Sequence, residues 1–262
     1  MGNIFIGTCS WTDRSLIESG LFYPSWSTTA EARLQFYASV FPTVEVDSSY
    51  YALPSAFTSK LWAERTPDDF VFHIKMFRLL TLHWTEPSAL PRDLRPLAPP
   101  SEKERFYLRD APKELADELL KRFTEAVLPL NSVGKLGVVL CQFPRWVGPR
   151  REVLDHILAL KENLLGFTMA VEFRNREWLA EGRRERTLKW LRDHGLVFVA
   201  VDEPQGFQSS VAPVATLTAD IGYVRFHGRN AATWEAPVTA PQVAGLYPCL
   251  PAGHYKTSSH WH

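Results

Sequence analysis

The chain has 262 residues, of which 45% are hydrophobic, and this is enough to bury the core of one large domain. Its 29 Lys and Arg residues balance 29 Asp and Glu residues, which excludes a whole-protein field for holding nucleic acid or an anionic membrane. The three cysteines, Cys9, Cys141 and Cys249, lie far apart, which argues against a disulfide framework or a Cys-x-x-Cys metal site and favours a reducing cytoplasm.

Short apolar runs alternate with amphipathic segments along the chain. Seven of these runs predict strands, and in chain order they cover residues 4–8, 44–47, 70–75, 136–143, 167–173, 196–201 and 221–226. The helices predicted between them cover residues 29–41, 55–66 and 110–127, with further helices around residues 154–158 and 188–195. No leader peptide or membrane-spanning run is recognisable, so we expect a cytoplasmic protein without a membrane partner.

One long excursion interrupts this alternation between the third and fourth predicted strands. Residues 86–100 contain five prolines, which prevent a continuous helix or a central strand. We expect this segment to be an exposed loop.

Near-continuous apolar strands that alternate with helices predict a parallel sheet covered by helices, either a closed barrel or a doubly wound sheet. Polar residues follow nearly every predicted strand, whereas an open sheet gathers its ligand site at one switch point. The pattern therefore favours an α/β fold of the TIM-type (β/α) barrel class, with residues 1–234 forming a single domain.

Four of the predicted strands carry two charged or ionisable residues at positions two apart. Side chains two apart in a strand point to the same side, and parallel strands end at the same edge of a barrel. We therefore expect the four pairs to line one pocket, and they are Glu45 with Asp47, His73 with Lys75, Glu172 with Arg174, and Arg225 with His227.

Several segments together closely resemble the DUF72 family, also called YecE-like, in order from the start of the chain to about Trp234. The segments that carry the resemblance are residues 6–11 (IGTCSW), 22–24 (FYP), 44–51 (VEVDSSYY), 66–70 (TPDDF), 142–144 (QFP), 171–174 (VEFR), 201–204 (VDEP) and 224–230 (VRFHGRN). The resemblance implies a TIM barrel. Labels that link the family to sugar isomerases or to endonuclease IV rest on similarity of fold, which does not give the chemistry.

The chain departs from the family pattern in two places. Asp47 stands where the family usually has Asn, which adds a negative charge to the expected pocket. Residues 235–262 contain neither the helical segment nor the eighth strand, rich in Phe and Asn, with which the family continues. We expect a barrel that is incomplete at its C-terminus, and we interpret residues 235–262 as an atypical tail, disordered or produced by a shifted reading frame.

Acid–base chemistry needs two groups of different proton affinity beside one substrate. Four residues at the ends of predicted strands meet this need, and we predict that they are catalytic: Glu172, Glu45, Asp202 and His227. The alternative is a buried layer of ion pairs, in which the two glutamates only neutralise neighbouring Lys and Arg side chains.

The predicted substrate contacts combine cations, polar groups and aromatic rings. They are Lys75, Arg174, Arg225, Arg229, Asn230, Trp11, Asp47, Tyr50 and Gln142. The cations would hold an anionic group and the rings would stack on a sugar-like ligand, although charge balance and core packing remain open as alternatives.

We predict an enzyme of the isomerase or hydrolase type that acts on a small anionic or sugar-like substrate, without a cofactor. A divalent metal ion is conceivable because the acidic and histidine residues are oxygen and nitrogen ligands, but cations lie among them and no metal-binding spacing occurs. The alternatives are a metal-dependent, phosphodiester-cleaving enzyme that acts on nucleic acid, and a ligand-binding module without catalysis.

Overall fold

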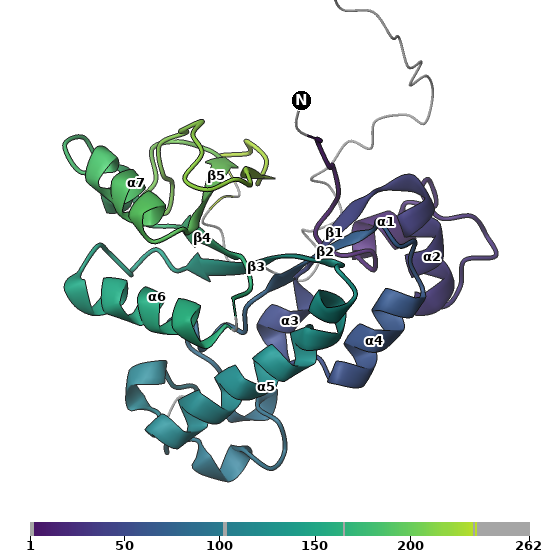
Figure 1. The fold of residues 1–262 in the computed structure, drawn as a ribbon, viewed down its shortest axis with the longest axis horizontal. Coiled ribbons are helices and arrows are strands. Elements are labelled where there is room, and N and C mark those ends of the chain that lie inside the picture. The colour runs from purple at the N-terminus through teal and green to yellow at the C-terminus, as the bar shows by residue number, and fades with distance from the viewer. Residues whose placement is uncertain (1–2, 102–103, 165, 233, 235–262) are drawn as a thin grey trace, which may run out of the picture.

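A computed structural model of the chain describes residues 3–101, 104–164, 166–232 and 234. Six parallel strands pair in chain order and curl into a half-barrel, which confirms the α/β class and an incomplete barrel of the TIM type (Figure 1). The strands are β1 (Thr43–Val46), β2 (Val71–Lys75), β3 (Leu136–Phe143), β4 (Met169–Phe173), β5 (Val197–Asp202) and β6 (Tyr223–Phe226). The predicted tail, residues 235–262, lies outside the described residues.

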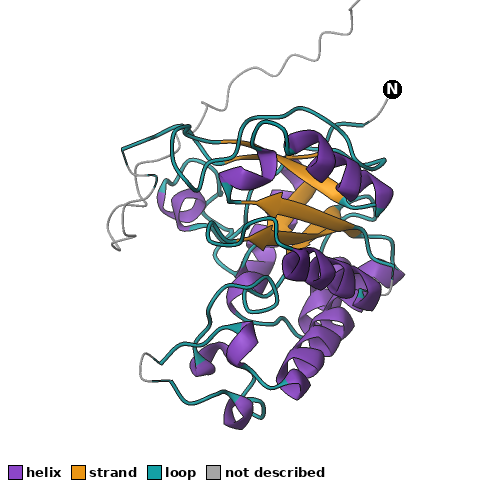
Figure 2. Ribbon diagram, turned by 90° about the vertical axis from the view of Figure 1, so that its left-hand side faces the viewer, coloured by secondary structure: helices purple, strands orange, loops and turns teal. Residues whose placement is uncertain are grey.

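Helices connect the strands and cover the outer side of the sheet (Figure 2). The α-helices are α1 (Arg14–Glu18), α2 (Ala30–Val40), α3 (Ser48–Tyr51), α4 (Ala56–Glu64), α5 (Lys113–Ser132), α6 (Arg151–Asn163) and α7 (Arg184–Asp193). Short 3-10 helices occur at η1 (Pro87–Ala89), η2 (Arg95–Leu97), η3 (Leu108–Asp110) and η4 (Arg176–Leu179). Ser55 is the N-cap of α4 and accepts a hydrogen bond from the Thr58 amide at 3.0 Å, which satisfies a free donor in the first turn of the helix.

The first predicted strand, residues 4–8, does not form a strand of the sheet. It runs beside β1, where the Glu45 amide donates to the Thr8 carbonyl at 3.0 Å and the Ser10 amide donates to the Glu45 carbonyl at 2.8 Å. Gly7 permits this approach, because a Cβ there would lie 2.1 Å from the Thr43 carbonyl oxygen. Within the part of the chain that the structure describes, no second strand pairs with this run, so the ladder stops at one isolated bridge between Cys9 and Glu45.

A register shift between β2 and β3 fixes the orientation of His73. Phe72 pairs with Leu136 but Ile74 pairs with Val139, so β3 contains one extra residue at this point. The Val138 amide donates to Nδ1 of His73 at 3.1 Å, and a Cβ on Gly137 would lie 2.4 Å from the His73 ring. Burial lowers the pKa of His73 to about 4, so this ring is an uncharged part of the interior at neutral pH.

Eight of the fifteen residues 86–100 are exposed, so the segment is largely the exposed loop that its prolines predict. Two short 3-10 helices, η1 and η2, form within the segment, since a proline at the start of a turn needs no amide donor. Leu90 and Leu94 are buried in the main core cluster. The segment is therefore anchored to the domain through its leucines.

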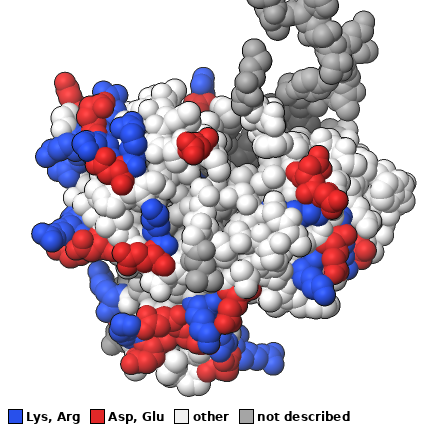
Figure 3. Space-filling view, viewed as in Figure 1, with Lys and Arg blue, Asp and Glu red and all other residues white. Residues whose placement is uncertain are grey.

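The core lies between the outer side of the sheet and the helices. Outward-pointing residues of the strands, such as Phe72, Val139 and Val171, are fully buried with Leu119 and Phe123 of α5. Acidic and basic side chains are interspersed over the lower part of the molecule in Figure 3, where α5 and residues 86–110 lie. The Arg122–Asp93 pair is one of these surface contacts, and such pairs contribute little to stability.

Leu119 and Leu128 provide a matched test of this core, because both lie on α5. Leu119 is fully buried, whereas Leu128 is 43% exposed. We expect Leu119→Ala to lower the free energy of unfolding by about 2–5 kcal/mol, because it leaves a cavity. Leu128→Ala should lower it by about 0.5 kcal/mol. Urea unfolding followed by far-UV circular dichroism measures both values, and equal losses would contradict the placement of α5.

Candidate functional site

Strand register places the predicted polar pairs on one side of the sheet. Glu45 pairs with His73, Gln142 pairs with Glu172, and Arg225 pairs with Val201. Paired residues of parallel strands point to the same side, and residues two apart along a strand share that side. We call the side that carries Glu45, Lys75, Glu172 and Arg225 the inner face; the helices cover the other side.

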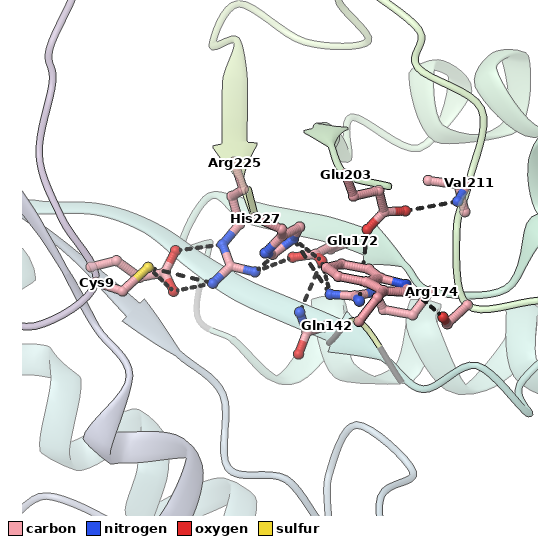
Figure 4. Close-up of polar contacts among 11 residues, drawn as sticks. Cys9, Gln142, Glu172, Arg174, Glu203, Val211, Arg225 and His227 are labelled. Carbon is pink, nitrogen blue, oxygen red and sulfur yellow. Dashed lines mark hydrogen bonds and ion pairs between the residues drawn. The ribbon is translucent and has the colours of Figure 1, made fainter. Parts of the chain in front are cut away.

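Arg225 joins the two ends of the half-barrel. Its Nε and Nη2 donate to the two carboxylate oxygens of Glu45 at 2.9 and 2.8 Å, and its Nη1 donates to Oε2 of Glu172 at 2.7 Å (Figure 4). Glu45 lies on β1 and Arg225 on β6, so the first and sixth strands of the sheet meet through side chains. The hydroxyl of Tyr223 donates to Glu45 at 3.0 Å and completes this contact.

Glu172 is fully buried and surrounded by hydrogen-bond donors. Gln142 donates to its Oε1 at 2.8 Å, and Nη1 of Arg174 lies 3.5 Å from the same oxygen. Burial alone would raise the pKa of Glu172, but the charge of Arg225 and the hydrogen bond from His227 hold this pKa well below its usual range. The side chain is therefore a permanent carboxylate at neutral pH.

This carboxylate determines which ring nitrogen of His227 carries the proton. Nε2 of His227 lies 3.0 Å from Oε1 of Glu172, and an ionised carboxylate only accepts hydrogen bonds, so Nε2 donates. Burial lowers the pKa of His227 below 6.5, which leaves the ring neutral near pH 7. Its Nδ1 consequently keeps a free lone pair, and the side chain remains 15% exposed.

Glu203 also lies beside this cluster, although sequence reasoning assigned it no role. Its Oε1 accepts a hydrogen bond from the Val211 amide at 2.8 Å, and Nη2 of Arg174 lies 3.7 Å from its Oε2. Burial raises the pKa of Glu203 from 4.5 to about 7, against the opposing charge of Arg174. The alternation of buried Val199 and Val201 along β5 points to this residue, because position 203 continues the inner face.

Asp202, by contrast, lies on the outer side of β5. It accepts from Nε of the exposed Arg229 at 3.0 Å and lines a surface hollow of about 520 Å³ with Val214 and Val224. Asn230 is exposed, and its side-chain oxygen accepts from the Ala232 amide at 3.1 Å. The structure thus does not bring Asp202, Arg229 and Asn230 to the inner face, because they do not follow the alternation that directs Glu203 inward.

Lys75, Asp47 and Tyr50 occupy the inner face beside β1 and β2. Nζ of Lys75 lies 4.5 Å from the centre of the Tyr50 ring, and His83 packs on the same ring at 5.2 Å. Burial raises the pKa of Asp47, while Lys75 opposes this shift. The carboxyl ends of these strands therefore combine a cation, a carboxyl group and a flat aromatic surface.

Trp11 is a core residue in this structure. It is only 7% exposed and packs edge-on against Trp62 and Phe72, with ring centres 5.5 and 6.4 Å away. The prediction that it faces a ligand conflicts with this packing. Its neighbour Cys9 lies closer to the site, with Sγ 3.5 Å from Oε1 of Glu45, but burial and Glu45 raise the pKa of this thiol to about 11. Cys9 is thus a protonated thiol at neutral pH.

The described residues contain neither a cluster of metal ligands nor a membrane-spanning helix. No group of three or more His, Cys, Asp or Glu side chains in residues 3–101, 104–164, 166–232 and 234 is arranged to hold a metal ion. Arg225 instead occupies the space between the two carboxylates, Glu45 and Glu172. No helix in these ranges is both long and apolar enough to cross a lipid bilayer.

Replacing Arg225 tests whether this residue holds the half-barrel together. We expect Arg225→Met to lower the free energy of unfolding by about 3–5 kcal/mol, because it leaves two buried carboxylates without their partner. Arg229→Met is the matched control, since Arg229 pairs with Asp202 while its side chain is 79% exposed. Guanidinium unfolding compares the two, and a loss no larger for Arg225→Met than for the control would contradict the interpretation.

The pH dependence of stability tests the environment of Glu203. The folded protein holds the Glu203 proton more tightly than the unfolded chain does, so wild-type stability falls as pH rises from about 4.5 through about 7. Glu203→Gln removes this contribution. We expect the stability of Glu203→Gln relative to wild type to increase by about 2 kcal/mol between pH 5 and pH 8. Glu181→Gln, at an exposed position, is the matched control.

The sequence and fold match a family of known proteins. The profile of the family described as "Protein of unknown function DUF72" matches residues 5–248. The UPF0759 protein YunF of Bacillus subtilis (strain 168) is 31% identical over 235 residues, which cover 89% of this chain and 73% of YunF. The UPF0759 protein YecE of Escherichia coli (strain K12) is 27% identical over 245 residues, which cover 87% of this chain and 75% of YecE.

Crystal structures of two relatives share the fold. A DUF72 family protein from Thermotoga maritima MSB8 superposes with a TM-score of 0.66 at 28% identity, over 89% of this chain and 78% of that protein. A DUF72 family protein from Enterococcus faecalis V583 gives a TM-score of 0.69 at 27% identity, over 88% and 73%. Since the family profile spans most of the residues and both folds agree, the chain belongs to the DUF72 family.

Proposed function

We propose that this chain is an enzyme that binds a small sugar-like or anionic substrate on the inner face and transfers a proton through His227. The observation that carries this proposal is the contact between Oε1 of Glu172 and Nε2 of His227, at 3.0 Å. A buried carboxylate that orients a neutral, partly exposed imidazole suits general-base catalysis, because the neutral ring accepts a proton near pH 7. Isomerisation and hydrolysis both begin with such a proton transfer, from carbon or from water.

The mechanism assigns different tasks to the two residues. Nδ1 of His227 accepts the proton, and Glu172 keeps the ring in the required tautomer and stabilises the imidazolium that forms. Arg174 and Arg225 lie near the same ring, since their Nη1 atoms are each 3.4 Å from Nε2. Their charges favour the neutral ring before the reaction. Glu172 is thus a positioning residue.

Two basic side chains flank the substrate position that we propose. Lys75 lies beside Tyr50 on one side, and Arg174 stacks on the Trp234 ring at 4.7 Å on the other. A guanidinium group such as that of Arg174 binds carboxylate or phosphate groups, and aromatic rings stack on sugars. Net charge zero speaks against nucleic acid as the partner. We also propose a cytoplasmic location, because Cys9 and Cys141 are free thiols.

Turnover of a panel of sugars, sugar phosphates and hydroxy acids, followed by NMR, tests this function. We expect His227→Asn to lower kcat about 10²–10⁴-fold, because it removes the proton acceptor. Glu172→Gln should lower kcat as well. Asp202→Asn is the matched carboxylate control and should keep wild-type turnover, because Asp202 lies on the outer side of β5.

Two outcomes would contradict the proposal. One is unchanged turnover by a folded His227→Asn protein. The other is stabilisation of the wild-type protein by panel compounds without any turnover, which would favour a binding module without catalysis.

A further inference from the structure

Lys75 differs from the other lysines in its contacts. Among the lysines in the described ranges, every one except Lys75 forms a hydrogen bond or an ion pair; the others are Lys60, Lys113, Lys121, Lys135, Lys161 and Lys189. Lys75 has neither, and its ammonium nitrogen instead lies over the Tyr50 ring. A lysine without a fixed partner is available to a ligand.

Lys135 shows what a structural lysine looks like in this protein. It is buried, and its Nζ donates to the carbonyl oxygens of Ala63 and Thr66 at 2.7 and 2.8 Å. These bonds tie the end of α4 to the start of β3. Lys75 points to the inner face of the sheet and makes no such bond among the described residues, so the packing of secondary structure does not explain it.

The surroundings of Lys75 favour its neutral, nucleophilic form. Burial lowers the pKa of Lys75, and the charge of Arg225 lowers it further, although Glu172, Glu45 and Cys9 oppose these effects. A lysine that is desolvated and close to another cation is the usual form of an activated amine. Asp47 lies next to Lys75, because the register of β1 and β2, continued by one residue, sets the two opposite each other.

We propose that Lys75 is a catalytic nucleophile that condenses with the carbonyl group of an aldehyde or ketone, such as the open-chain form of a sugar-like substrate. This inference rests on the proposed function, because it names the substrate class of the same inner face. A protonated imine formed at Lys75 withdraws electrons from the adjacent carbon, and that effect makes a proton on this carbon available to His227.

The condensation is balanced in atoms and charge. The lone pair of neutral Nζ attacks the carbonyl carbon, the C–N bond forms, and a proton moves from nitrogen to the carbonyl oxygen to give a carbinolamine. Asp47 first takes up a proton from the Lys75 ammonium, which leaves Nζ neutral for the attack. It then returns this proton to the hydroxyl group, which leaves as water while the nitrogen lone pair forms the C=N bond. The products are one protonated imine, one water molecule and the Asp47 carboxylate.

Reductive trapping in the wild-type protein tests this proposal directly. The full chain is incubated at pH 7 with glyceraldehyde or dihydroxyacetone and sodium cyanoborohydride, and peptide mass spectrometry follows the initial rate of alkylation at each lysine. We expect Lys75 to react at least about tenfold faster than the exposed Lys60, because burial and the charge of Arg225 lower the pKa of Lys75 and the neutral amine is the form that attacks a carbonyl group. Equal or slower labelling at Lys75 would overturn the proposal, whether or not any variant folds.

Variants separate this proposal from the proposed function. Lys75→Arg keeps the positive charge and should abolish both trapping at residue 75 and turnover, whereas Lys60→Arg should change neither. Lost turnover in His227→Asn with preferential trapping at Lys75 supports both proposals. Preferential trapping with unchanged turnover in His227→Asn contradicts only the role of His227, and lost turnover without preferential trapping contradicts only the role of Lys75.

Discussion

The contact of Arg225 with Glu45 and Glu172 is the interaction on which both the shape and the chemistry of this protein depend. Six parallel strands can form an open, gently twisted sheet, but the side chains of β1 and β6 meet only when the sheet curls. Two buried carboxylates around one guanidinium are favourable only when the geometry is good and all the donors are used. Here Nε and both Nη atoms of Arg225 bond to carboxylate oxygens, so the curled form satisfies the charges that the interior contains.

Two carboxyl groups near this contact have opposite character. Glu172 has four donors and remains charged, while Glu203, a few ångströms beyond Arg174, has a raised pKa and gains a proton near neutrality. Environments that separate the proton affinities of neighbouring groups are typical of acid–base sites. His227 lies against the charged member of this pair, and Lys75 lies toward the other edge of the inner face. The layer of ion pairs and the proposed catalytic site are therefore one structure.

The alternation of side chains along a strand predicts much of the candidate site from the sequence. The inward direction of Glu45, Glu172, Arg225 and His227 follows from their spacing within buried strands. Asp202 stands at the end of its strand but points outward, whereas the alternation of Val199 and Val201 predicts that Glu203 points inward. The run at residues 4–8 has strand composition but pairs on one side within the described residues, and the pairing of a segment cannot be predicted from its own composition.

The extra residue in β3 has a consequence for how this chain can tolerate changes in length. Side chains in a strand alternate, so which of them faces inward depends on whether an odd or even number of residues separates them from a fixed point. The extra residue near Gly137 lets Gln142 lie beside Glu172. Without it, the pairing of Phe72 with Leu136 would continue in step, and Val139 would lie opposite Lys75. Gln142 would then point to the outer side of the sheet. The alternation of side chains therefore limits insertions and deletions in this strand. With the start of β3 fixed, one residue inserted before Gln142 would place the thiol of Cys141 beside Glu172, and one residue deleted there would place the ring of Phe143 beside it.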